Sequence, residues 1–285
     1  MKRGIRIVPI LVALLAMAWM YFSAEKFVNP ETGEVHRGAL SEAQEDRLGL
    51  QSYQQVLSEE RVIQSGPQVD LVRQVAQRLA VATGDAANKF QWAVSVVDNR
   101  QVNAFCLPGG KIVVYTGILP VAQTPEGLAT VMGHEMAHAT SRHGSQRLLQ
   151  SQMMQTAMAG AQFSMADLDY QSQRTLIALL GGAAQYGAIL PFSRNHELEA
   201  DHIGLIYMAR AGYDPREAIE FWKRMGQASS GQQPPEFAST HPSNYNRIQQ
   251  LEAYMPEALK IYEQSEGRQQ QQPYRLKIPN VEPTR

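Results

Sequence analysis

The sequence predicts an α+β protein that is mostly helical, with a small β-sheet ahead of its central helices. The stretches Phe90–Asp98 and Val102–Tyr115 are rich in β-branched and aromatic residues, which favour strands. From Thr124 onward the apolar residues recur with helical spacing. Hydrophobic residues make up 44% of the 285 residues and charged residues 19%, which is enough for a packed core and excludes a disordered chain.

The N-terminus predicts a membrane anchor or a signal peptide over residues 1–24. Lys2, Arg3 and Arg6 precede the stretch Ile7–Ala24, which carries no charge. Aromatic residues continue to the end of this stretch and favour an uncleaved anchor over a cleaved signal. By the positive-inside rule we expect an exported protein. It would be anchored in the inner membrane with the rest of the chain on the periplasmic face, or soluble in the periplasm after cleavage.

Residues 25–115 are predicted to contain a linker, then two helices, then the strands. Residues 25–40 contain Pro and Gly and read as a linker, and a capping box at Ser41 opens a helix to about Leu57. A second helix is expected from Gln68 to about Thr83. The motif Pro108-Gly109-Gly110 interrupts the second strand region, which leaves Lys111–Tyr115 as a predicted edge strand.

The remaining chain is predicted to be helical up to residue 264. The expected helices are 125–157, 170–187, 194–211, 215–227 and 243–264. The uncharged stretch Thr175–Phe192 is interpreted as a buried helix, with a second membrane span as the alternative. Residues 265–285 are Gln- and Pro-rich and predict a disordered tail. Residues 41–264 therefore form one predicted domain.

Charge and cysteine content narrow the classes of function. The 26 basic and 27 acidic residues give a formal net charge of -1, so we expect no nucleic-acid partner. The single cysteine, Cys106, excludes a disulfide framework and a multi-cysteine metal cluster. It lies between apolar residues of a predicted strand, where a buried structural role is expected. A tightly bound metal would need histidine and carboxylate ligands.

The strongest motif is His134-Glu135-Met136-Ala137-His138, which fits the pattern HExxH within a predicted helix. Histidines four residues apart lie on one face of a helix, so both imidazoles can reach one ion. Glu135 can lie beside a metal-activated water and accept its proton. The alternative is a solvated helix face with two unrelated histidines, which the combination of pattern and helix context disfavours.

A catalytic zinc ion needs a third protein ligand, which the predicted helix 194–211 can supply. Glu197 is the favoured ligand, and Glu199 is the fallback. Asp201 lies one turn beyond Glu197 and can accept a hydrogen bond from a zinc-binding imidazole. His143 lies five residues after His138, on a different helical face, and is not expected to bind the metal.

These motifs resemble the HtpX and CAAX-prenyl-protease type of gluzincin zinc metalloendopeptidases, peptidase family M48. The segment Glu197–Asp201, the strand Asn103–Phe105 and the motif Thr240-His241-Pro242 add to the likeness, which covers roughly Leu40 to Tyr262. The resemblance implies a zincin-like domain, one Zn²⁺ per chain and Glu197 as the third ligand. Multi-spanning members have several membrane helices, and only one is predicted here, so the exported single-anchor branch fits better. That branch implies quality control of envelope or membrane proteins.

The expected activity is hydrolysis of peptide bonds in unfolded or extended polypeptides. The zinc ion would polarise a water and the scissile carbonyl, while Glu135 removes the water's proton and delivers it to the leaving amine. An edge strand formed by Lys111, Ile112, Val113, Val114 and Tyr115 would pair with the substrate, unless its role is only structural.

Two further residues are candidates for the site. His241 is a candidate fourth ligand, oxyanion group or helix cap, and Arg247 is a candidate oxyanion or ligand-supporting group; His202 and Tyr245 are weaker candidates of the same kind. The alternative function is a chaperone-like or binding factor that retains the zinc fold with little proteolysis. The sequence leaves the oligomeric state open.

Overall fold

The computed structural model describes residues 5–84, 86–184, 190–228, 236–237, 241 and 247–265. Their structure is mostly helical with two small sheets, which confirms the predicted α+β class. The chain divides into two compact units. One contains Met1–Ser41 and Arg142–His196, and the other contains Glu42–Ser141 and Glu197–Arg285. The predicted domain 41–264 contributes residues to both units, and the predicted tail beyond Ser265 lies outside the described residues.

The second unit contains a four-stranded sheet in the order β3-β4-β6-β5. Its strands are β3 (Val62–Ile63), β4 (Ala93–Val97), β5 (Ala104–Leu107) and β6 (Lys111–Tyr115). β6 pairs with β4 in parallel and with β5 in antiparallel register. The prediction that Lys111–Tyr115 is an edge strand is therefore wrong, because hydrogen bonds on both sides use its backbone groups. Among the described strands, β5 forms that edge of the sheet.

Helices cover both faces of this sheet, in agreement with the alternation of its apolar residues. On one face Tyr53 of α2 (Glu42–Glu59) packs on β4 and β6, and its hydroxyl is 2.7 Å from Ser95 Oγ. On the other face Ile112 and Val114 join the main core with α3 (Pro67–Ala82) and α6 (Pro125–Thr140). Adjacent residues of a strand point to opposite faces of the sheet, so β4 and β6 contribute side chains to the apolar clusters on both faces.

α6 is the central helix of this unit. Its N-cap is Thr124, whose hydroxyl accepts a hydrogen bond from the amide of Gly127 at 2.9 Å, and Pro125 occupies the first turn. Every residue from Gly127 to Thr140 is buried. The other helical elements are α4 (Ala86–Lys89), η1 (Thr116–Ile118), α5 (Leu119–Ala122), α10 (Glu217–Ala228), α12 (Arg247–Ser265) and α9 (Leu190–Arg210), whose residues up to His196 belong to the first unit.

The predicted helix 125–157 is in fact two helices. α6 ends at Thr140, and α7 (His143–Ser164) begins after Arg142, which adopts a left-handed conformation with φ 54° and ψ 34°. Within the first unit the Arg142 guanidinium donates to the carbonyl of Leu40 at 2.5 Å and stacks on Phe27 at 4.6 Å. Tertiary contacts thus hold a backbone conformation that an arginine disfavours in isolation.

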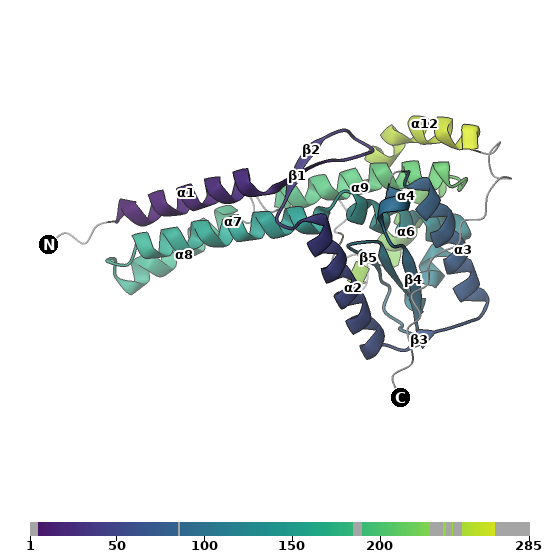
Figure 1. The fold of residues 1–285 in the computed structure, drawn as a ribbon, viewed down its shortest axis with the longest axis horizontal. Helices are drawn as coiled ribbons and strands as arrows, with labels where there is room; N and C mark the ends of the chain where they lie inside the picture. Colours follow the sequence, from purple (N-terminus) through teal and green to yellow (C-terminus); the bar gives the residue numbers. More distant parts are fainter. Residues whose placement is uncertain are drawn as a thin grey trace. The chain divides into compact units, whose positions relative to one another are not determined.

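The first unit consists of α1 (Ile7–Ser23), a hairpin, α7 and α8 (Tyr170–Ala184), and the three helices are drawn from purple to teal in Figure 1. The hairpin pairs β1 (Glu25–Val28) with β2 (Val35–Gly38), so the predicted linker 25–40 is largely a β-structure. Its turn is closed by Asn29, whose side chain accepts the amide hydrogen of Glu31 at 2.9 Å. Among the described residues, none of the helices combines the length and the apolar character that crossing a membrane requires.

Candidate metal centre

α6 places His134 and His138 one helical turn apart on the same face, as the motif predicts. Their Nε2 atoms are 3.1 Å apart. His134 is 2% exposed and His138 is 9% exposed, so both imidazoles lie in an environment largely closed to solvent. The two nitrogen atoms therefore point to one common position.

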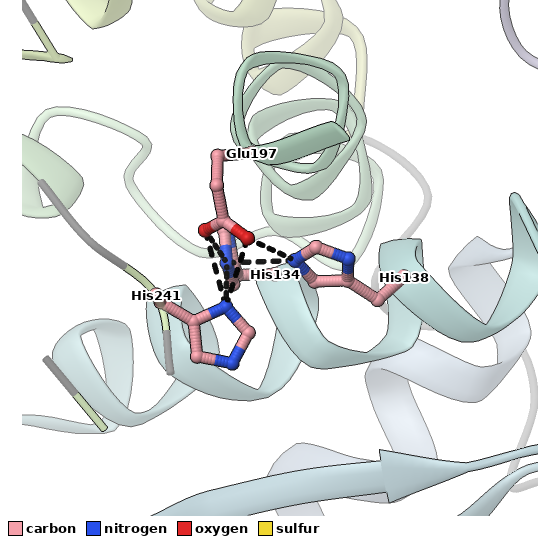
Figure 2. A group of neighbouring side chains, drawn as sticks. All are labelled: His134, His138, Glu197 and His241. Carbon is pink, nitrogen blue, oxygen red and sulfur yellow. Dashed lines mark hydrogen bonds and ion pairs between the residues drawn. The ribbon is translucent and has the colours of Figure 1, made fainter. Parts of the chain in front are cut away.

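Glu197 reaches this position from α9, whose backbone runs close to that of α6. A Cβ atom on Gly204 would lie 3.1 Å from the backbone nitrogen of His134, so a glycine allows the two helices to approach. Glu197 Oε2 is 3.3 Å from His134 Nε2, and Glu197 Oε1 is 3.4 Å from His138 Nε2 (Figure 2). The third predicted ligand thus converges with the first two.

Asp201 lies one turn further along α9 and fixes the orientation of His134. Its Oδ1 is 2.9 Å from His134 Nδ1, which leaves Nε2 of the same ring directed at Glu197 and His138. A carboxylate that binds the outer nitrogen of an imidazole sets its tautomer and raises its basicity as a metal ligand. Asp201 therefore occupies the supporting position predicted for it.

The donor atoms of this cluster have the spacing that zinc requires. Ligand atoms at about 2.1 Å from a tetrahedral zinc lie roughly 3.4 Å from one another. The three distances among His134, His138 and Glu197 are 3.1, 3.3 and 3.4 Å, and two imidazoles with one carboxylate form a common set for catalytic zinc. These residues therefore fit a zinc ion without rearrangement.

The charges of the cluster are strongly coupled. Burial tends to raise the pKa of Glu197, but hydrogen bonds with His134 and His241 outweigh it and hold the pKa well below its ordinary value. Burial tends to lower the pKa of His134, yet Asp201 and Glu197 raise it to about 9. Without a metal ion the cluster thus favours an ionised carboxylate beside a protonated imidazole.

Glu135 lies beside the cluster and is 4% exposed. Its Oε1 is 3.3 Å from His241 Nε2, and it accepts a hydrogen bond from the backbone of Cys106 on β5. Burial is the largest influence on its pKa and raises it above the ordinary value of a glutamate. A carboxylate with a raised pKa next to a metal site suits a general base.

His241 completes a group of four potential ligands with His134, His138 and Glu197, whose ligand atoms all lie within 4.8 Å of one another. Its Nδ1 is 3.3 Å from His134 Nε2 and 3.1 Å from Glu197 Oε2. The ring stacks on the buried Phe237 at 4.7 Å. Thr240 and Pro242, the other residues of that sequence motif, lie outside the described residues.

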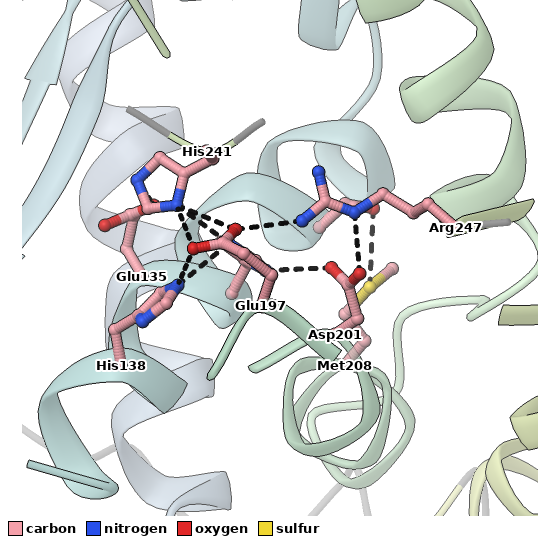
Figure 3. A network of polar contacts seen from close by, with 9 residues as sticks. Glu135, His138, Glu197, Asp201, Met208, His241 and Arg247 are labelled. Carbon is pink, nitrogen blue, oxygen red and sulfur yellow. Dashed lines mark hydrogen bonds and ion pairs between the residues drawn. The ribbon is translucent and has the colours of Figure 1, made fainter. Parts of the chain in front are cut away.

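Arg247 binds both carboxylates of the cluster. Its Nε donates to Asp201 Oδ2 at 2.7 Å and its Nη2 donates to Glu197 Oε2 at 2.9 Å. The guanidinium carbon lies 3.8 Å from the centre of the Trp222 ring. In Figure 3 Arg247 reaches Glu197 from one side and His241 reaches it from the other. The structure therefore gives Arg247 a role in holding Glu197 and Asp201.

The other sequence candidates lie elsewhere. Glu199 is absent from the four-residue group, and His202 binds Glu257 at 2.8 Å. His143 is buried, stacks on His196 at 4.0 Å and is not a member of the four-residue group. Tyr245 lies outside the described residues.

Trp222 and Phe237, the apolar residues that pack against the cluster, were missed by sequence reasoning. The rings of Trp222 and His134 form a T-shaped contact with their centres 5.6 Å apart, and Phe237 forms a contact of the same kind with His134 at 6.2 Å. Neither residue belongs to a motif, and aromatic residues at helical spacing are equally common in ordinary cores. Only the fold shows that these two surround the metal ligands.

A mostly helical α+β fold, an HExxH helix and a glutamate ligand on a following helix together define a zinc metallopeptidase of the gluzincin type. Comparison with known families agrees, because the model of peptidase family M48 matches residues 68–255. The chain belongs to peptidase family M48.

Named relatives are found in eukaryotes and bacteria. The mitochondrial metalloendopeptidase OMA1 of Schizosaccharomyces pombe is 34% identical over 251 residues, which are 86% of this chain and 71% of the relative. The metalloendopeptidase OMA1 of Danio rerio is 33% identical over 265 residues, which are 87% of this chain and 54% of the relative. The β-barrel assembly-enhancing protease of Escherichia coli is 27% identical over 223 residues, covering 77% of this chain and 45% of that protein. Apart from the S. pombe protein, the chain spans about half the length of these relatives or less.

Proposed function

We propose that this zinc metalloendopeptidase cleaves unfolded or unassembled polypeptides of a cell envelope or organelle membrane. The names of the relatives support this proposal, since one is a β-barrel assembly-enhancing protease and others are mitochondrial metalloendopeptidases. The charge-free stretch after a basic N-terminus supports an exported protein held at the inner membrane, with the peptidase unit on the periplasmic face. Cleavage of residues 1–24 would release it as a soluble periplasmic protein.

The chemistry follows from the positions of four side chains. His134, His138 and Glu197 would hold the zinc ion, which when bound supplies Lewis-acid activation of a water and of the scissile carbonyl. Glu135 lies beside these ligands and takes the proton of the attacking water, then delivers it to the nitrogen of the leaving amine. Asp201 keeps His134 in the orientation that this arrangement needs.

The substrate is proposed to bind along β5 and not along β6. β5 is an edge strand among the described strands, and its Cys106 backbone is hydrogen-bonded to Glu135. An extended peptide added to this edge would therefore run past the general base. An unfolded chain can adopt that extended form more readily than a folded protein, which supports the proposed class of substrate.

His241 is proposed as a fourth ligand that keeps the site closed until substrate arrives. Its Nδ1 lies 3.3 Å from His134 Nε2 and 3.1 Å from Glu197 Oε2, so it could serve as the fourth ligand of a zinc ion held by His134, His138 and Glu197. A site with four protein ligands has no open position and resembles a structural zinc site. Displacement of His241 would open the site for a water and a carbonyl.

The convergence of His134, His138 and Glu197 beside Glu135 carries the proposed activity. The test is a Glu135→Gln variant, compared with wild type for zinc content and for cleavage of an unfolded protein such as reduced casein. We expect wild-type cleavage that a chelator abolishes and zinc restores, and a zinc-loaded variant whose rate is about 10²–10⁴-fold lower. Cleavage at the wild-type rate by the zinc-loaded variant would refute the role of Glu135. Zinc binding without any cleavage by wild type would favour the binding-factor alternative.

A further inference from the structure

The first unit exposes an unusual amount of apolar surface. We call its helices α1, α7 and α8 the apolar arm. Most of the large hydrophobic side chains that are exposed among the described residues lie on this arm. Examples from all three helices are Leu15, Trp19 and Phe22 of α1, Phe163 of α7, and Leu179 and Leu180 of α8. Phe163 is 67% exposed and Leu179 is 64% exposed, so the exposed apolar surface is not confined to α1.

Charged residues are missing from the middle of each helix in the arm. α1 contains none, α7 contains none between Arg147 and its end at Ser164, and α8 contains none after Arg174. A water-exposed helix of a soluble protein normally carries charges on its outer face. The outer face of α1 lacks them throughout, and the outer faces of α7 and α8 lack them after Arg147 and Arg174.

Charges are instead gathered at the two ends of α1. At its start Arg6 binds Asp167, with Arg6 Nε 2.7 Å from Asp167 Oδ2, and Lys2 and Arg3 precede it in sequence. At its end Arg37 donates to the carbonyl of Tyr21 at 2.9 Å and stacks on that ring at 4.7 Å. A charge-free middle between two charged ends is the pattern of a segment that lies in hydrocarbon with its ends in the headgroup layers.

The dimensions and packing of the arm agree with this pattern. The 17 residues of α1 extend over about 26 Å at 1.5 Å per residue, which reaches into most of the depth of a bilayer core of roughly 30 Å but does not cross it. α1 approaches α7 closely at Gly160, where a Cβ atom would lie only 2.4 Å from Ala13 Cβ. Small residues at such crossings are typical of helix pairs in lipid. Thr156 of α7 donates to the carbonyl of Gln152 at 2.9 Å, so its hydroxyl is satisfied within the helix.

We propose that the whole apolar arm inserts into a lipid bilayer, so that α7 and α8 contact acyl chains together with α1. This inference rests on the proposed membrane location and extends it, because the sequence favours membrane contact for residues 1–24 and gives a membrane span over Thr175–Phe192 only as the alternative to a buried helix. A protein partner is the other occupant of such a surface, but it would not account for charges placed at both ends of the charge-free helix α1. The basic residues at the N-terminus suit anionic headgroups.

The test measures which helices meet lipid. Single cysteines at Leu15, Phe163, Leu179 and Val81 are introduced into the full chain with Cys106→Ser and labelled with an environment-sensitive fluorophore. Val81 lies on α3 of the other unit and is 52% exposed, which makes it the matched surface control. Each protein is reconstituted into vesicles of phosphatidylcholine and phosphatidylglycerol at roughly 3:1, with or without lipids that carry a quencher on the acyl chain. Zinc content of each variant reports that the peptidase unit is folded.

We expect the probes at Leu15, Phe163 and Leu179 to be quenched about two-fold or more, and the Val81 probe to keep its fluorescence. Quenching at Leu15 without quenching at Phe163 and Leu179 would overturn the proposal and leave α1 as the sole membrane element. Absence of quenching at all four positions would overturn the membrane location as well. Neither result would bear on peptidase activity, which the Glu135 variant tests separately.

Discussion

Replacing Arg247 by methionine tests how the metal ligands are held in place. Arg247 is 2% exposed, and its side chain binds Asp201 at 2.7 Å and Glu197 at 2.9 Å. Methionine has a similar length and can still cover Trp222, but it carries no charge. The variant therefore leaves two buried carboxylates without their shared cation, while the packing around them changes little.

The expected loss is large on the scale of protein stability. Removing one partner of a buried ion pair costs about 3–5 kcal/mol, because the charge left behind is desolvated and uncompensated. For a protein of this size, 1 kcal/mol shifts the unfolding temperature by about 2–4 °C, so the zinc-free variant should unfold about 6–20 °C below wild type. Zinc at Glu197 supplies positive charge to one of the same carboxylates, and the difference should shrink when zinc is added.

The assay is thermal unfolding of wild type, Arg247→Met and Arg247→Lys, each with chelator and with zinc. Lysine keeps the charge but cannot reproduce two directed hydrogen bonds, so an intermediate unfolding temperature is expected. Arg216→Met is the control, since Arg216 forms an exposed pair with Asp214, and surface pairs of this kind contribute little to stability. Equal unfolding temperatures of zinc-free wild type and Arg247→Met, or the same loss with and without zinc, would refute the reasoning.

Three further variants or measurements address other parts of the site. If His241 closes it, His241→Ala should raise cleavage of an unfolded protein several-fold at unchanged zinc content, and unchanged or lower cleavage would contradict the closing role. Gly204→Ala places a Cβ 3.1 Å from the backbone nitrogen of His134, so α9 and α6 must move apart and the zinc affinity should fall about tenfold. The affinity is measured by competition with a chelator, and a wild-type value would show that the two helices can separate at no cost. Burial, with a smaller effect of Glu135, raises the pKa of the Cys106 thiol well above its ordinary value. Because the thiolate is the reactive form, iodoacetamide at pH 8 should modify the folded protein much more slowly than the urea-unfolded protein, and equal rates would argue against a raised pKa.

The parts of the site that sequence could predict are those fixed by local periodicity. The spacing of His134 and His138 places both on one face of a helix wherever that helix lies in the fold. The same reasoning gives Glu197 and Asp201 a shared face, and the close approach of α9 to α6 then brings the faces together. Trp222 could not be predicted in this way, because it comes from α10 and meets the cluster only through tertiary packing.

The errors concern features that depend on contacts distant in sequence. Lys111–Tyr115 is an inner strand because β5 pairs with it in antiparallel register. The apolar pattern of one strand does not show which strands will lie beside it. The end of α6 at Thr140 has no Pro or Gly at the break, and contacts of Arg142 within the other unit stabilise the left-handed turn. The hairpin 25–38 did have a turn signal at Asn29 and Gly33, but strands of four residues are too short to show an alternating pattern.

The predicted metal ligands lie far apart in the sequence, so a bound ion would also crosslink two parts of the chain. The segment Arg142–His196 belongs to the unit that contains the N-terminus. In the sequence, His138 lies just before this segment and Glu197 lies directly after it. An ion bound to both residues closes a loop of roughly 60 residues and, by the chain-entropy relation for crosslinks, would disfavour the unfolded state by about 4 kcal/mol. A protease cut within that segment would then break the backbone without releasing the fragments, since both ligands belong to one unit. The nicked protein should migrate as a single species on a native gel and separate once it is denatured in the presence of a chelator.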